Sequence, residues 1–213
     1  MVIKRFWDDP GLTRLDTRVV AVDGDAVRLE QTIFFAESGG QESDSGTIGG
    51  RPVREARYDG LDIVYRLDPE HGLAPGDAVV VEIDGERRQR LLRLHFAAEL
   101  VLELVNRRCA GIVKIGAHIA ADKARIDFLW PDSLAAILPA VAHDAAQLIA
   151  ADHPVVSAFS DPVRERRYWD IDGFARVACG GTHPRRSGEV GALTLVRKNP
   201  GRGKERIEIR LLS

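Results

Sequence analysis

The sequence predicts an α+β protein of two domains, a small all-β domain over residues 1–84 and an α+β domain over residues 85–213. Two observations support this prediction. The first eighty or so residues contain short β-branched runs separated by Gly and Asp, which is typical of a small barrel or sandwich. From Glu86 to Arg108 there is no Pro or Gly, and apolar residues recur at helical spacing. The change in pattern places the boundary near Asp84-Gly85.

Short strands account for the first domain. Residues 17–22 are rich in β-branched residues, and the turn Asp23-Gly24-Asp25 leads to a return strand at residues 26–29, which predicts a hairpin. A loop rich in small and polar residues follows at residues 37–50. The other strands are expected at residues 32–35, 51–58, 62–67 and 77–83.

Two helices and several strands are expected in the second domain. The first helix spans residues 86–108 and ends before Gly111. The second spans residues 133–151, with Ser133 as its N-cap. The strands are expected at residues 112–115, 117–120, 124–128, 155–159, 175–178, 192–197 and 206–211.

Composition and charge exclude several classes of protein. The chain has 213 residues, 45% hydrophobic and 29% charged, which is too apolar for a disordered protein. Its net charge is −2, so binding to nucleic acid would need local basic patches. The apolar runs are too short for a membrane span and the N-terminus lacks the apolar core of a signal peptide. Two cysteines form no disulfide framework, which predicts a reducing cytoplasm.

The segment Cys179-Gly180-Gly181-Thr182-His183 is the strongest candidate for chemistry. Cys and His are the preferred zinc ligands, and the two glycines allow a tight backbone path between them. A buried Cys beside a loop His is the alternative interpretation. His95 and Glu99 lie one turn apart in the first helix and therefore share a face. Together the two pairs supply four candidate ligands, the number that zinc requires.

Basic residues gather in two places. Arg87 and Arg88 belong to a cluster at the start of the first helix, and residues 185–210 have a local charge of +5. Within the second cluster, Gly201-Arg202-Gly203-Lys204 is expected to form a flexible loop between strands, which suits contact with a phosphate backbone. A solvated surface is the alternative.

Three motifs together resemble the alanyl-tRNA synthetase editing-domain family. Residues 84–95 resemble the approach to its first metal motif. Residues 179–183, followed by Ser187-Gly188-Glu189-Val190-Gly191, resemble the second metal motif and the segment after it. Residues 35–41, with Asp44 and Gly46, resemble the Gly-Gly-Gln loop of its β-barrel. The chain has no room for an aminoacylation domain, so the resemblance is to the free-standing editing proteins that keep the barrel.

The resemblance implies a fold and a function. The fold is a small β-barrel followed by an editing domain of the threonyl/alanyl-tRNA synthetase second-additional-domain type. The function is hydrolysis in trans of tRNA for alanine that carries serine or glycine, with one zinc ion per chain and His95, Cys179 and His183 on ligand positions. The residues expected to bind substrate are Thr32, Gly39, Gly40, Gln41, Gly180, Gly181 and Thr182, and those expected to bind RNA are Arg87, Arg88, Arg202 and Lys204.

Glu99 departs from the family, whose first metal motif is His-x3-His. Glu99 either replaces the second His as a ligand, or stays off the metal as a general base, or marks a site that binds metal poorly. Two other functions therefore remain open: a non-catalytic tRNA-binding relative, and a zinc-dependent hydrolase of small amino-acid esters.

Overall fold

The computed structural model describes residues 1–212 and forms two compact units. The first unit comprises residues 1–38 and 42–89, and the second comprises residues 39–41 together with the chain from residue 90 onward. The described chain has two α-helices and sixteen strands, so the predicted α+β class is confirmed. The finer domain type and the boundary at residue 84 stay predictions.

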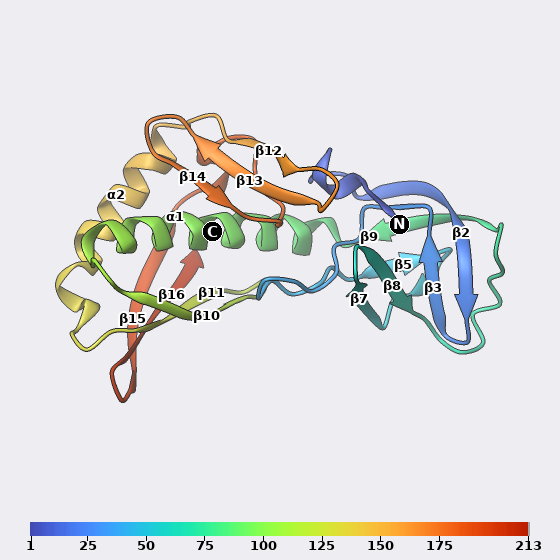
Figure 1. The fold of residues 1–213 in the computed structure, drawn as a ribbon, viewed down its shortest axis with the longest axis horizontal. Coiled ribbons are helices and arrows are strands. Elements are labelled where there is room, and N and C mark those ends of the chain that lie inside the picture. Colours follow the sequence, from blue (N-terminus) through green and yellow to red (C-terminus); the bar gives the residue numbers. More distant parts are fainter. Residues whose placement is uncertain (213) are drawn as a thin grey trace. The chain divides into compact units, whose positions relative to one another are not determined.

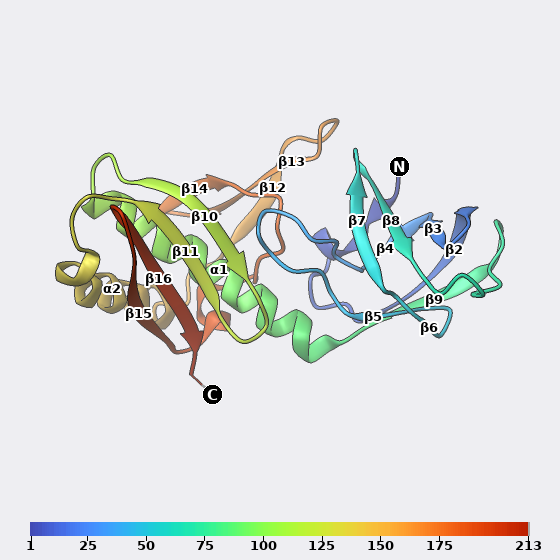
Figure 2. The ribbon, with the colours of Figure 1, turned by 90° about the horizontal axis from the view of Figure 1, so that it is seen from below.

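The first unit is built on a curled, seven-stranded antiparallel sheet (Figure 2). The predicted hairpin is present, with Asp23 paired to Ala26 across its turn. A two-stranded parallel pair and a 3-10 turn, η1 (Arg5–Trp7), complete the unit. The pair is β1 (Ile3–Lys4) with β4 (Gln31–Thr32), and the order of the large sheet is β6 (Arg51–Pro52), β5 (Gly46–Ile48), β9 (Ala78–Ile83), β2 (Arg14–Asp23), β3 (Ala26–Leu29), β8 (Asp62–Arg66) and β7 (Glu55–Asp59).

The strand expected at residues 32–35 ends at Thr32. Beyond it the backbone binds side chains in place of a neighbouring strand. The Phe34 N–H donates to Thr32 Oγ1 at 3.0 Å, and the Phe35 N–H donates to Asp44 Oδ2 at 2.7 Å. The segment is nevertheless fully buried, because apolar side chains pack into a core whether or not their backbone joins a ladder.

Helix α1 (Gly85–Arg108) belongs to the second unit from Arg90 onward, where it lies between two antiparallel sheets (Figure 1). Apolar side chains of α1 share one core with both sheets. Helix α2 (Leu138–Ala150) packs against the 3-10 turn η3 (Ser187–Val190) and against strand β15 (Leu193–Gly201). One sheet has the order β10 (Val113–Ile119), β11 (Ala124–Leu129), β16 (Lys204–Leu211) and β15 (Leu193–Gly201), and the other has β12 (Val156–Asp161), β13 (Arg166–Ile171) and β14 (Ala175–Ala178).

Three local predictions for the second unit need correction. Ser133 caps a 3-10 turn, η2 (Leu134–Ala136), and α2 begins only at Leu138. The strands expected on either side of Gly116 are one strand, β10, with an irregularity between Lys114 and Gly116. Strand β13 was not predicted at all. Across the described residues no helix has the length and apolar character needed to cross a membrane.

Candidate metal centre

Three of the four predicted metal ligands converge in the second unit. His95 comes from α1, Cys179 follows β14 directly, and His183 lies four residues further on. The Nε2 atom of His95 lies 3.2 Å from Cys179 Sγ, and one ligand atom of each residue lies within 4.8 Å of the other two. The tight cluster is the arrangement expected of residues that address one ion.

Glycine at position 181 permits this approach. A Cβ atom there would lie 2.5 Å from His95 Nε2, which is far inside van der Waals contact. Arg167 holds the same turn from β13. Its carbonyl accepts the Cys179 N–H at 3.0 Å, and its Nη1 atom donates to the Gly181 carbonyl at 3.3 Å. The ligand loop is therefore fixed to the three-stranded sheet.

The buried atoms of the cluster suit zinc. Ser157 Oγ lies 3.1 Å from His183 Nδ1 and orients that ring, whereas His183 Nε2 is buried with no hydrogen-bond partner in the protein. An unpartnered buried nitrogen is costly unless a ligand occupies it. Two imidazole nitrogens and one sulfur form a donor set that zinc accepts. The residues present therefore fit the metal that the sequence predicts.

Burial controls the protonation of the three side chains. It lowers the pKa of His95 to about 4, with a further contribution from the positive charge of Lys114. Burial also lowers the pKa of His183 well below its usual value. For Cys179, burial raises the pKa to about 12, and the nearby Glu99 charge adds to that rise. Burial thus favours the neutral form of both imidazoles, as metal ligation needs, and it opposes ionisation of the thiol, which a bound cation would favour.

Glu99 lies beside this cluster but is not one of its three converging residues. The indole Nε1 of Trp169, which is fully buried, donates to Glu99 Oε2 at 3.3 Å. Burial raises the pKa of Glu99, while the indole hydrogen bond and the charge of Lys114 lower it. The role of Glu99 as a fourth ligand stays a prediction.

The tip of the Gly-Gly-Gln loop belongs to the second unit. The Ile119 N–H donates to the Gly40 carbonyl at 2.8 Å, and Gln41 forms a β-bridge with Ile119. Gly40 has φ +87°, and a Cβ atom there would collide with the Ala117 carbonyl oxygen. Gly39, at φ +62°, is exposed. Glycine is thus needed for this tip to dock on β10.

Two predicted substrate-binding residues of the second unit have unused polar atoms. Both side-chain polar atoms of Gln41 and the hydroxyl of Thr182 are buried and have no hydrogen-bond partner in the protein. Thr32 differs, because its hydroxyl accepts from Tyr65 Oη at 2.7 Å and from a backbone N–H within the first unit. Thr32 is fully buried in the first unit, and its role in substrate binding stays a prediction.

The four predicted RNA-binding residues fall into two kinds. Arg202 is exposed in the turn between β15 and β16, and Lys204, also exposed, is the first residue of β16. Arg87 is half-buried, and its Nη2 atom donates to Glu42 Oε2 at 2.6 Å. Arg88 is completely buried in the first unit and pairs with the buried Asp44. The prediction that Arg88 contacts RNA is therefore wrong, because its guanidinium cannot reach a phosphate.

Sequence analysis missed three residues that support the cluster, Ser157, Arg167 and Trp169. The last two lie on β13, the strand that was missed. Arg167, Trp169 and Ile171 are buried while the residues between them are not. This alternation over residues 166–171 was the available signal.

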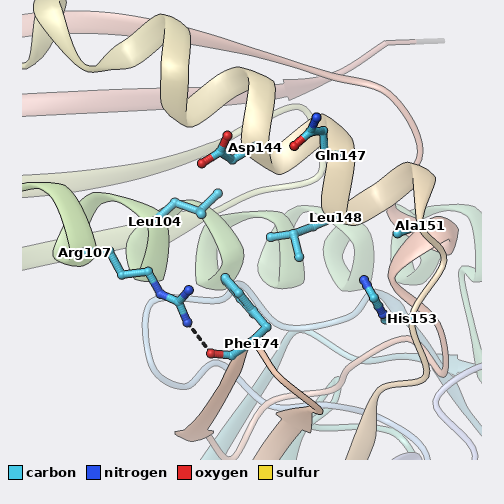
Figure 3. A pocket seen from close by; sticks show the side chains of 8 residues that line it. All are labelled: Leu104, Arg107, Asp144, Gln147, Leu148, Ala151, His153 and Phe174. Carbon is cyan, nitrogen blue, oxygen red and sulfur yellow. Dashed lines mark hydrogen bonds between the residues drawn. The ribbon is translucent and has the colours of Figure 1, made fainter.

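A separate pocket of about 310 Å³ lies between α1, α2 and the turn before β14 (Figure 3). The guanidinium of Arg107 covers the Phe174 ring at 4.3 Å and donates to the Phe174 carbonyl. Asp144 and His153 contribute to its rim, and none of the cluster residues lines it. This pocket is therefore distinct from the candidate metal centre.

The fold and the cluster define an α+β protein with a candidate metal site. Comparison with known proteins shows which family of this class the chain belongs to. No protein-family model matches the chain. An alanyl-tRNA editing protein AlaX-M from Pyrococcus horikoshii is 30% identical, and the match covers 98% of this chain and 97% of that relative. A second AlaX-M, from Methanosarcina barkeri, is 29% identical over 89% of this chain and 90% of its own length. The chain belongs to the alanyl-tRNA editing protein family.

A second group of relatives matches over only part of its length. An alanine–tRNA ligase from Methanopyrus kandleri is 32% identical over 95% of this chain, but the match spans 24% of that ligase. The chain therefore corresponds to about a quarter of the ligase and to nearly the whole of the AlaX-M relative from Pyrococcus.

Proposed function

We propose that this protein is a deacylase that hydrolyses, in trans, the ester bond of tRNA for alanine carrying serine or glycine. The convergence of His95, Cys179 and His183 carries the proposal, because it supplies a metal site in a chain that matches an alanyl-tRNA editing protein over nearly its whole length. Removal of wrongly attached amino acids would serve the fidelity of translation.

One zinc ion per chain would be held by His95, Cys179 and His183. The ion would supply Lewis-acid chemistry at the ester bond. Other residues of the chain would hold these ligands in position. Ser157 fixes the His183 ring, and Arg167 fixes the turn between the other two ligands.

We propose Glu99 as the general base of this reaction. Trp169 engages its Oε2 atom, so Oε1 is the oxygen left to take a proton from an attacking water. A raised pKa strengthens a carboxylate as a base, provided that it stays ionised at the working pH. Ligation through Oε1 is the alternative role, since zinc also accepts carboxylate oxygen.

The buried, unused polar atoms of Gln41 and Thr182 are proposed to bind the aminoacyl adenosine, with Gly39, Gly40 and Gly180 shaping the backbone around it. Binding of a substrate that supplies the missing hydrogen-bond partners is favourable, because it removes the free-energy cost of leaving these atoms unpaired. Arg202 and Lys204 are proposed to contact the tRNA backbone.

The test is deacylation of seryl-, glycyl- and alanyl-tRNA for alanine by purified protein. We expect hydrolysis of at least one of the first two, loss of activity with a chelator, and recovery on addition of zinc. Cys179→Ala should lose metal and activity together. Cys109→Ala is the matched control, because that cysteine lies outside the cluster and should keep both.

Two outcomes would contradict the proposal. Protein that binds tRNA but contains no zinc and hydrolyses no charged tRNA would be the non-catalytic relative. Protein that hydrolyses seryl esters of simple alcohols as fast as seryl-tRNA, without salt-dependent binding of tRNA, would be a hydrolase of small esters.

A further inference from the structure

Strand β10 contains a bulge that changes where its side chains point. Lys114 pairs with Phe128 and Gly116 pairs with Asp127, so Ile115 is one residue too many for the partner strand. Such a bulge reverses the alternation of side chains from that point along the strand.

The pairing shows which face Lys114 occupies. Residues directly opposite one another across two strands lie on the same face of the sheet. Phe128, the partner of Lys114, is fully buried in the core that α1 shares with this sheet. Without the bulge, Lys114 would share the opposite face with His118, whose partner Arg125 is outside that core. The bulge therefore turns Lys114 toward the helix that carries His95 and Glu99.

The charge of Lys114 reaches the candidate metal centre. Beside the larger effect of burial, it lowers the pKa of His95. It also lowers the pKa of Glu99 and the pKa of Cys179, in both cases as a smaller effect than that of burial. The register and these electrostatic effects agree that Lys114 faces the candidate metal centre.

Lys114 also remains available to a ligand. It is exposed, and β10 is an edge strand of the four-stranded sheet (Figure 2). Within residues 1–212, neither an ion pair nor a hydrogen bond engages its ammonium group. A cation at the rim of a site that is held in no ion pair or hydrogen bond attracts an anionic ligand.

We propose that Lys114 binds the 5′-phosphate of the terminal nucleotide of the charged tRNA and thereby positions its ester at the metal centre. This inference rests on the proposed function. The scissile ester is on the ribose of the terminal nucleotide, so the nearest phosphate is separated from it by one sugar. A lysine binds phosphate as a flexible point charge, which suits a contact made at the rim.

The test compares three substrates that differ in phosphate content: seryl-tRNA for alanine, 3′-seryl-adenosine 5′-monophosphate, and 3′-seryl-adenosine, which has no phosphate. Lys114→Met removes the charge and keeps an apolar stem. Lys114→Arg restores the charge. Lys123→Met is the matched control, because Lys123 lies at the turn of the same hairpin and its ammonium pairs with Glu208 at 3.3 Å.

We expect Lys114→Met to raise KM about 10-fold for the two phosphate-containing substrates, with little change in kcat, because one charged contact is lost. The KM for 3′-seryl-adenosine should not change. The salt slope of tRNA binding should fall by about 0.7, the value for one phosphate of a single strand. Lys114→Arg should recover most of the loss, and zinc content should equal that of the wild type in every variant.

Three results would overturn the inference. Equal losses with and without the phosphate would mean that Lys114 acts on the ester or on Glu99. No loss on any substrate would mean that it is a solvated lysine, and loss of zinc would make it part of the metal site. A wild-type protein that leaves all three substrates intact would instead refute the proposed function, and this inference with it.

Discussion

Substitution of Gly181 by alanine tests whether the three ligands act as one metal site. The new Cβ atom would lie 2.5 Å from His95 Nε2 and 2.7 Å from His95 Cε1. Because ordinary contacts begin near 3.5 Å, the ring must move by about 1 Å. Zinc–ligand distances tolerate only about 0.2 Å, so a shift of this size removes His95 from the site.

The expected result is a loss of zinc affinity of at least about 100-fold, since disturbance of residues behind the ligands alone costs 10- to 100-fold. Competition with a chromogenic chelator measures this directly, and elemental analysis gives the stoichiometry. Gly180→Ala is the control, because a Cβ atom there would meet nothing within 4 Å. If Gly181→Ala and Gly180→Ala bound zinc equally well, His95 would not be a ligand.

Three further predictions concern other parts of the molecule. Glu99→Gln should keep zinc but reduce kcat by about 10²- to 10⁴-fold if Glu99 is the general base, whereas loss of zinc in elemental analysis would make it a ligand. Replacing Arg202 and Lys204 together by Ala should reduce the salt slope of tRNA binding by about 2, and an unchanged slope would exclude phosphate contacts. Asp44→Asn should lower the free energy of unfolding, measured in urea, by about 3–5 kcal/mol, because it leaves the buried Arg88 charge without its counter-ion, and a cost below about 1 kcal/mol would contradict this.

Elements defined by local patterns were predicted well. The uninterrupted helical spacing of residues 86–108 and the turn at Asp23-Gly24-Asp25 each depend on neighbours in the chain, and both are present in the structure. The strand at residues 32–35 was predicted too long. Its apolar residues look like a strand, but the acceptor that binds the Phe35 N–H is Asp44, nine residues away in a loop.

The predicted functional residues show the same difference between local patterns and contacts that are distant in the chain. Cys179 and His183 were identified because their chemistry and their glycines are contiguous. Arg88 was wrongly predicted to bind RNA because its charge resembles that of its exposed neighbours. Its partner Asp44 lies 44 positions earlier in the chain, and both side chains are buried. Trp169 was missed because its role appears only when β13 is set beside α1, where the indole meets Glu99.

Lys114 illustrates why the rim of the site could not be predicted from the sequence. Strict alternation along residues 113–119 assigns Lys114 to the face of His118, away from α1. One additional residue, Ile115, reverses that assignment, and only the pairing with β11 reveals it. Bulges are common beside active sites because they turn a side chain toward a site without moving the rest of the strand. In this protein the candidate metal ligands Cys179 and His183 are therefore encoded in one short motif, whereas the charge proposed to hold the substrate depends on the register of a sheet.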